Sequence, residues 1–348
     1  MTNSSILNTE SAILKSIAGD FPRHPRQLNG LLEADAEIIS LPGKNDEWLV
    51  VKTDGIHEEI KEKLYQDPYL VGWMTVTAPI SDIAAVGACP TGILLSLVLP
   101  KQYSNDWLQR FKAGINDACS TYNIYVLGGD TNFDDVFSIS ATAVATIKFQ
   151  RPLLRTGMKP GDSLYATAPL GLGNAYAYYK LFDSTISVDY QPIARLKESK
   201  TISQFASACM DTSDGLFPAL SVLSEINGLG FKLITPLQST LSPAVLPTQQ
   251  HAGLPAWMFL AGPHGEYELL FTVPGQANKK FRQACYDENW QPVFLGEVIP
   301  ENKLTFFSES LEIDCHPAAI ANLFYESGGN VQTYFERLML QHKKWSNT

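Results

Sequence analysis

The stretch Ser81-Asp82-Ile83-Ala84-Ala85-Val86-Gly87-Ala88 places one acidic residue among small and apolar ones. It completes an apolar pattern over residues 69–86, which predicts a long helix that ends at Gly87, because glycine commonly terminates helices. The apolar neighbours of Asp82 predict that its carboxyl group is buried. A buried carboxylate is costly unless it has a partner, and a metal ion is one such partner. This stretch therefore predicts a helix that carries a functional acidic group into the interior.

Strands and helices alternate on both sides of this helix, which favours an α/β (α+β) fold. Before residue 149 the patterns predict helices over 10–19 and 104–122 and strands over 36–41, 48–53, 93–99 and 138–147. After residue 160 they predict strands over 163–167, 267–273 and 293–298 and helices over 172–181, 194–205 and 215–226. The segment 149–160 between them is rich in proline and glycine, as domain boundaries often are. We therefore expect domains over 1–150 and 151–310 and a helical extension over 311–348.

Composition limits the classes of function. The 348 residues exceed what one ordinary core holds, in agreement with two domains. The sequence contains no run of about 18 apolar residues that would predict a membrane span. Its first residues lack a signal-peptide pattern, so we expect a cytoplasmic protein. The net charge of −10, without a long basic run, argues against nucleic-acid binding. The five cysteines form no CxxC pair, which argues against a thiolate zinc site.

Acidic residues recur beside small ones in four places: Thr53-Asp54-Gly55, Ser81-Asp82, Gly128-Gly129-Asp130-Thr131 and Asp211-Thr212-Ser213-Asp214-Gly215. An acidic protein can hold a triphosphate by placing Mg²⁺ between its own carboxylates and the phosphates. Each place also has a structural interpretation, because Thr-Asp-Gly is common in turns, Ser-Asp-Gly caps helices, and paired glycines form tight turns.

The order and spacing of these segments resemble those of thiamine-monophosphate kinase, within the wider AIR-synthase-like superfamily. The resemblance runs from about residue 10 to residue 298. It rests on the four acidic segments together with Glu58, Gly72-Trp73, Arg155-Thr156-Gly157, Pro160-Gly161-Asp162, Leu216, and the block Glu266-Tyr267-Glu268-Leu269-Leu270-Phe271.

The resemblance implies a two-domain fold in which the N-terminal domain forms a homodimer with a shared barrel and the C-terminal α/β domain packs beside it. It implies ATP in a cleft near the dimer interface, with Mg²⁺ on aspartates. The implied metal ligands are Asp54, Asp82, Asp130 and Asp214, with Asp35 and Asp211 as additions; Asp130 and Asp214 are the implied catalytic residues. The implied nucleotide-binding residues are Thr53, Glu58, Gly128, Gly129, Thr131 and Ser213, with Thr53 supporting Asp54.

The implied reaction passes the γ-phosphoryl group of ATP to the phosphate of thiamine monophosphate. That acceptor is already ionised, so no general base is required, and positioning with charge neutralisation supplies most of the catalysis. His57, beside a motif, has two interpretations: an acceptor contact or a solvated loop histidine.

Three segments depart from the family pattern. Residues 32–36 read Leu-Glu-Ala-Asp-Ala where the family has Gly-Asp-Asp, and residues 264–269 read His-Gly-Glu-Tyr-Glu-Leu where it has Gly-Glu-Asp-Tyr-Glu-Leu. Pro79 stands where the family tends to have asparagine. These departures leave three explanations open: a paralogue with another phosphate acceptor, a binding protein with part of its metal site lost, or a kinase in which Glu33 and Glu266 restore the missing ligands.

Other reaction classes within the superfamily also have to be weighed. Selenophosphate synthetase is disfavoured, because no cysteine precedes Cys89, and the hydrogenase-maturation protein is disfavoured, because the sequence ends Trp345-Ser346-Asn347-Thr348 without a cysteine. An AIR-synthase-like enzyme acting on another small molecule is excluded by no single residue. A non-catalytic nucleotide-binding scaffold is the alternative outside the enzymes.

Overall fold

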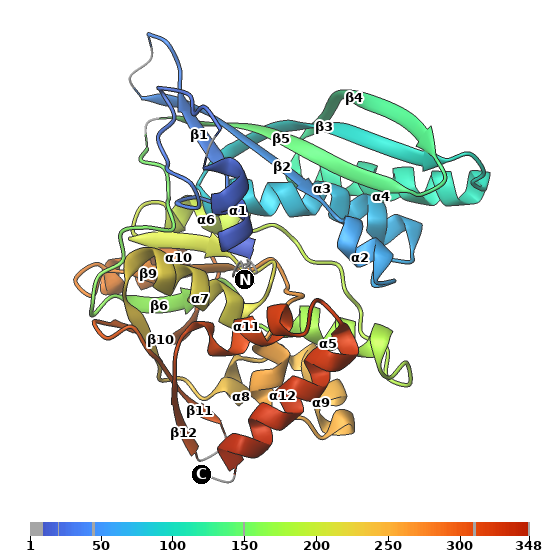
Figure 1. Ribbon diagram of the computed structural model, residues 1–348. Helices are drawn as coiled ribbons and strands as arrows, with labels where there is room; N and C mark the ends of the chain where they lie inside the picture. The colour runs from blue at the N-terminus through green and yellow to red at the C-terminus, as the bar shows by residue number, and fades with distance from the viewer. Residues whose placement is uncertain (1–9, 20, 44–45, 149, 309–310, 347–348) are drawn as a thin grey trace, which may run out of the picture.

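The computed structural model describes residues 10–19, 21–43, 46–148, 150–308 and 311–346. The N-terminal segment without a signal-peptide pattern and the first residue of the expected domain boundary lie outside these ranges. The chain forms two sheets with helices packed against them, one sheet in the upper and one in the lower half of Figure 1. The expected α/β (α+β) class is therefore confirmed.

The first sheet has five strands in the order β1-β2-β5-β3-β4. Only the β3–β4 pair is parallel. Helices α3 and α4 lie along this sheet (Figure 1), and α1 (Glu10–Ala18) and α2 (His57–Lys61) are shorter. The bounds are β1 Glu37–Ser40, β2 Glu47–Gly55, α3 Pro68–Ala85, β3 Cys89–Pro100, α4 Asn105–Tyr122, β4 Tyr125–Asp134 and β5 Ser138–Lys148.

The sheet is open within the single chain. Strand β4 pairs with β3 on one side only, and all of its residues are exposed. The barrel implied by the resemblance is therefore not found within the described part of one chain.

The second sheet has seven strands in the order β12-β11-β8-β10-β6-β9-β7. Its strands are β6 Ser163–Ala166, β7 Ala208–Asp211, β8 Gly230–Leu233, β9 Leu269–Val273, β10 Val293–Ile299, β11 Leu304–Ser308 and β12 Leu311–Cys315. Its α-helices are α5 Leu172–Leu181, α6 Leu196–Ile202, α7 Leu216–Asn227, α8 Leu237–Thr240, α9 Leu246–Ala252, α10 Asn278–Asp287, α11 Ala318–Glu326 and α12 Val331–Ser346, with 3₁₀ turns η1 Pro243–Val245 and η2 Ala256–Leu260.

The tail differs from its expectation as a purely helical extension. It begins with β12, which pairs antiparallel with β11 from Leu304↔Cys315 to Ser308↔Leu311, and only then forms α11 and α12. The five residues of β12 are an alternating strand pattern too short to be separated from a helix turn by periodicity alone. Among the helices of the described ranges, none is long and apolar enough to cross a lipid bilayer.

Helix α3 is buried along its whole length from Leu70 to Ala85. Two glycines let it lie against α4: a Cβ atom on Gly72 would come within 2.1 Å of the Phe111 carbonyl oxygen, and one on Gly114 within 2.0 Å of the Tyr69 carbonyl oxygen. Pro79 lies inside this helix. A helix this buried needs apolar residues on every face, and its sequence provides them.

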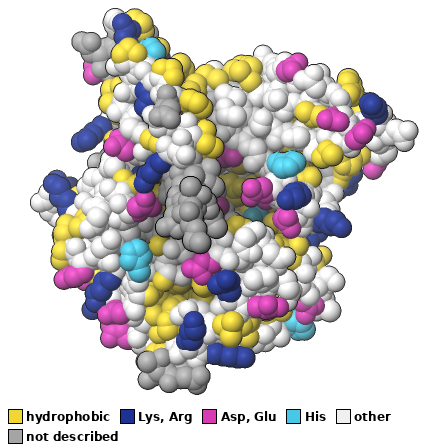
Figure 2. All heavy atoms as spheres, in the orientation of Figure 1, with side chains coloured by type: hydrophobic (Ala, Val, Ile, Leu, Met, Phe, Trp, Pro, Cys, Tyr) yellow, Lys and Arg dark blue, Asp and Glu magenta, His cyan; other side chains and the backbone are white. Residues whose placement is uncertain are grey.

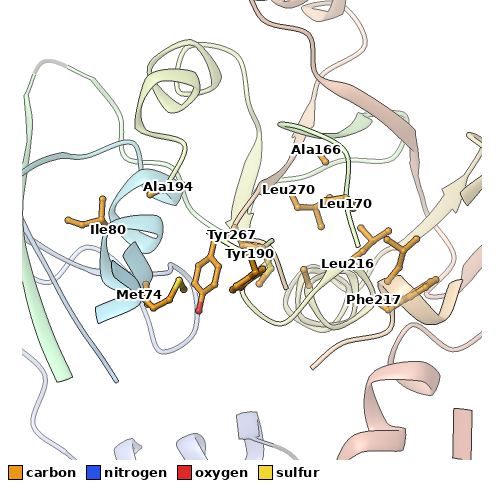
Figure 3. Close-up of a cluster of buried hydrophobic side chains, with 14 of the residues drawn as sticks. Met74, Ile80, Ala166, Leu170, Tyr190, Ala194, Leu216, Phe217, Tyr267 and Leu270 are labelled. Carbon is orange, nitrogen blue, oxygen red and sulfur yellow. The ribbon is translucent and has the colours of Figure 1, made fainter. Parts of the chain in front are cut away.

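The core continues from α3 into the second half of the chain. Figure 3 shows Met74 and Ile80 of α3 on one side, Tyr190 and Tyr267 between, and Leu216 of α7 on the other side. Because α3 contacts both halves, a polar side chain near its C-terminal end can meet side chains from the second sheet.

Candidate active site

Three carboxylates converge at the junction of the two halves. One oxygen each from Asp35, Asp82 and Asp211 lies within 4.8 Å of the other two, and all three side chains are buried. Asp35 precedes β1, Asp82 lies in the last turn of α3, and Asp211 ends β7. We call these residues the acidic trio. Like charges at such separations repel strongly in a buried site, so the trio requires cations nearby.

Two serines fix the orientation of Asp211. Ser81 Oγ donates a hydrogen bond to Asp211 Oδ2 at 2.7 Å, and Ser213 Oγ donates to Asp211 Oδ1 at 2.9 Å. Burial, followed by the charge of Asp35, raises the pKa of Asp211 to about 6, although these two hydrogen bonds oppose the rise. The carboxyl group is therefore held in one orientation but retains a tendency to bind a proton.

Two basic side chains contact the trio. Arg155 donates to Asp35 Oδ1 from Nη2 at 2.6 Å and from Nε at 3.2 Å. Lys52 Nζ, on β2, lies 3.0 Å from Asp82 Oδ2. Burial acts to lower the pKa of Lys52, but the charges of Asp82 and Asp54 outweigh it and raise that pKa above its usual value. Burial raises the pKa of Asp82 well above its usual value, with Lys52 opposing. Lys52 therefore offsets only part of the cost of burying Asp82.

The donor set fits a hard divalent cation. All three ligands are carboxylate oxygens, which Mg²⁺ prefers. Asp35 Oδ2 is buried and has no hydrogen-bond partner, although buried carboxylate oxygens are almost always paired. A divalent cation at the trio would satisfy that oxygen and supply the missing charge.

The other predicted metal ligands lie outside the trio. Asp54 follows Lys52 by two residues on β2, so both side chains lie on the same face of the strand, and Asp54 Oδ1 accepts a hydrogen bond from the Gly55 amide at 2.8 Å. Asp130 lies on the exposed strand β4 and accepts a hydrogen bond from Asn132 Nδ2 at 2.7 Å. Asp214 is exposed in the turn before α7.

The predicted nucleotide-binding residues are also spread out. Thr53 points to the opposite face of β2 from Asp54, where its hydroxyl group contacts Thr142 Oγ1 at 2.8 Å, so it does not support Asp54. Thr131 and Glu58 are exposed, and Ser213 bonds Asp211. Like Glu58, His57 is an exposed residue of α2.

Gly129 has a packing reason of its own. Gly128 and Gly129 have φ values of +151° and +155°, and a Cβ atom on Gly129 would come within 2.0 Å of the Leu95 carbonyl oxygen on β3. The approach of β4 to β3 therefore already requires glycine at this position.

On the face drawn in Figure 2, the surface is hollowed between the upper and lower halves, and acidic side chains lie along this hollow.

The two glutamates that could restore missing ligands have other contacts. Glu33 Oε2 accepts a hydrogen bond from the Gly30 amide at 2.6 Å. Glu266 is buried, accepts from the Gly171 amide at 2.7 Å, and accepts from Thr212 Oγ1 at 3.2 Å. Neither belongs to the three-carboxylate cluster found among the described residues. In this structure the side chains of Glu33 and Glu266 instead accept hydrogen bonds from backbone amides.

Gly265 has a steric reason to lack a side chain. A Cβ atom there would come within 1.7 Å of the Thr212 carbonyl oxygen and 2.5 Å of the Gly215 amide nitrogen. The Gly265 amide donates to the Ser213 carbonyl at 2.7 Å, and Tyr190 Oη donates to the Gly265 carbonyl at 2.7 Å. The segment 264–266 is thus packed directly against the turn that follows Asp211.

Sequence reasoning missed the roles of Lys52, Arg155 and Ser81, which lie in or beside the motifs. For Lys52 a signal existed, because it precedes Asp54 by two residues on a predicted strand and must share its face. Arg155 and Ser81 act across more than 100 residues of sequence, and no local pattern predicts such pairings.

We predict that Glu266 gives the protein a pH-dependent stability. Burial, followed by the charge of Glu268, raises the pKa of Glu266 to about 8 from an ordinary value of 4.5. A raised folded-state pKa means that this contribution is full below about pH 4.5 and is lost as the pH rises through 8. The melting temperature of Glu266→Gln relative to the wild type should therefore rise between pH 6 and pH 9. A difference that stays constant across this range would contradict the assignment.

Comparisons with known proteins agree with this architecture. A family model described as AIR synthase related protein, N-terminal domain, matches residues 33–147. AaThiL complexed with AMPPCP and TMP has the same fold, with a TM-score of 0.71 at 22% identity over 87% of this chain and 93% of that chain.

The sequence relatives are more specific. Thiamine-monophosphate kinase of Buchnera aphidicola subsp. Acyrthosiphon pisum is 28% identical over 249 residues, which are 69% of this chain and 75% of that protein. Thiamine-monophosphate kinase of Pyrococcus abyssi is 30% identical over 270 residues, which are 76% of this chain and 82% of that protein. The chain therefore belongs to the thiamine-monophosphate kinase family.

Proposed function

We propose that the protein transfers the γ-phosphoryl group of ATP to the phosphate of thiamine monophosphate, with Mg²⁺ held by Asp35, Asp82 and Asp211. The observation that carries this proposal is the buried acidic trio with the unpartnered Asp35 Oδ2, in a chain of this family. The charge of Asp54 acts on both Lys52 and Asp82, although Asp54 is not a member of the trio. We include Asp54 as an additional metal ligand outside the trio. A bound Mg²⁺ would neutralise the charge that spreads over the transferred phosphoryl group.

The residues of the chain would act by positioning. The acceptor is itself a phosphate, so no side chain has to remove a proton from it. Ser81 and Ser213 hold Asp211 in a fixed orientation, and Arg155 fixes Asp35. The carboxylates therefore have to reorient little when the trio binds its cation. Lys52 is partly exposed at the edge of the trio, where a positive charge can reach phosphate oxygens.

We also propose a homodimer formed through β4. Its unpaired edge carries exposed apolar side chains at Tyr125, Val126, Leu127 and Phe133. A long exposed edge strand with such side chains is a template for pairing with another strand. Pairing with a second copy would close the sheet towards the shared barrel of the family and bring Asp130, Thr131 and the adjoining glycines to the partner's acidic trio. In the same proposal, Asp214 faces the phosphates from the turn before α7.

We also propose domains over 1–150 and 151–310 with an extension over 311–348. We further propose small-molecule substrates rather than nucleic acid, and a cytoplasmic location. The alternatives are a paralogue with another phosphate acceptor and a nucleotide-binding protein without turnover. The specific observation behind both is that Ala34 and Gly265 stand at two family carboxylate positions.

Product formation tests the proposed activity. With ATP, Mg²⁺ and thiamine monophosphate, we expect thiamine diphosphate by chromatography, and none in EDTA. Asp82→Asn and Asp130→Asn should lower kcat by about a hundredfold or more, because each removes an anionic ligand. Asp287→Asn should match the wild type, since Asp287 is an exposed residue of α10 bonded to Gln283. ATP binding without product would favour one of the two alternatives, and full activity of both site variants would reject the metal assignment.

Mixing two inactive variants tests whether the site is shared between subunits. If Asp130 serves the partner's trio, a heterodimer of Asp82→Asn and Asp130→Asn has one doubly altered and one intact site. Random exchange should then restore about a quarter of wild-type activity, because half of the dimers are mixed. A mixture that stays inactive, although an affinity tag on one variant co-purifies the untagged other variant, would place Asp130 in the site of its own chain.

A further inference from the structure

Two basic side chains contact the acidic trio, and they differ in the number of contacts that they make with it. Arg155 donates two hydrogen bonds to Asp35 Oδ1 and its side chain is 16% exposed. Lys52 forms a single ion pair with Asp82, and its side chain is 27% exposed. An ammonium group on a flexible four-carbon chain can leave its partner more easily than a forked guanidinium group. Lys52 is therefore the cation of this site that can move.

The charges around Lys52 cannot all stay as they are when a metal binds. The trio carries up to three negative charges, and Asp54 lies on the same face of β2 as Lys52. Lys52 and Arg155 supply two positive charges, so room remains for one more cation. A divalent ion on Asp82 and Asp211, however, would bring two positive charges close to an ammonium group that is 3.0 Å from Asp82 Oδ2. At such a separation like charges repel strongly.

We propose that Lys52 holds the place of the metal in the nucleotide-free protein. Its ammonium group neutralises Asp82 until a divalent cation arrives, and it then moves to the phosphate oxygens of the nucleotide that arrives with the cation. This inference rests on the proposed function, in that it needs a metal–nucleotide complex as the ligand of the trio.

The exchange makes metal and nucleotide depend on each other. Metal alone displaces Lys52 from Asp82 and brings no new anionic partner for it, so it binds weakly. Metal with nucleotide offers Lys52 a new anionic partner, so each ligand strengthens the binding of the other, as coupled sites require. The free protein is at the same time protected from the repulsion of unpaired buried carboxylates.

The test measures Mn²⁺ binding to the purified protein, first alone and then with a non-hydrolysable ATP analogue. Lys52→Met keeps an unbranched side chain of nearly the same length and removes its charge. It should bind Mn²⁺ alone roughly tenfold more tightly than the wild type, because the competing cation is gone. Its melting temperature in EDTA should fall, and the analogue should tighten Mn²⁺ binding less than in the wild type. If Lys52→Met does not fold, Lys52→Gln serves the same comparison.

Lys148→Met is the matched control, since Lys148 forms a surface ion pair with Glu47 in the same sheet, at 3.5 Å. It should bind Mn²⁺ as the wild type does. Equal or weaker Mn²⁺ affinity in the Lys52 variant, or no Mn²⁺ binding by either protein, would overturn the inference. A protein that forms no thiamine diphosphate yet shows the tenfold difference would reject the proposed acceptor and leave the role of Lys52 standing.

Discussion

The burial of a carboxylate on α3 is the constraint on which the rest of the site depends. Asp82 lies in a helix packed against α4 through Gly72 and Gly114 and against the second half of the chain through its other faces. A charge in such a place must be neutralised, and it lies near the C-terminal end of its helix, where the helix dipole favours cations. Lys52 meets this need in part, and the proximity of Asp211 increases it.

Contacts within the second half of the chain, and between it and α3, fix the position of the region around Asp211. The segment between α5 and α6 crosses the junction: Trp73 Nε1 donates to the Pro192 carbonyl at 2.8 Å, and Tyr190 bonds Gly265. Arg195, at the end of that segment, forms a bidentate pair with Glu268 beside β9. These contacts connect α3 to the residues next to β9, the strand that pairs with β7. The loss of the family carboxylate at Gly265 is thus compatible with the fold, because the backbone there leaves no room for a side chain.

The sequence predicts the helices and strands better than it predicts the contacts between them. The helix over 69–86 and the strand over 48–53 are confirmed, because their apolar periodicity reflects burial that each segment must satisfy locally. Strand β7, which ends in Asp211, was not predicted. Asp82 was predicted to be buried for the same reason. What periodicity cannot show is which buried carboxylates meet: Asp35 and Asp211, which the resemblance placed second, form the trio, whereas Asp130 lies on an exposed edge strand. Strand β12 was missed because five alternating residues carry too little signal.

The central claim is that Asp35, Asp82 and Asp211 together hold a divalent cation that faces the phosphates of a nucleotide. Family membership and the unpartnered oxygen of Asp35 both support it. Anomalous diffraction from crystals grown with Mn²⁺ and a non-hydrolysable ATP analogue tests it most directly. A cation held by the trio should give an anomalous peak within bonding distance of oxygens from all three aspartates. Mn²⁺ bound elsewhere, with Lys52 and Arg155 still the cations that contact the trio, would contradict it.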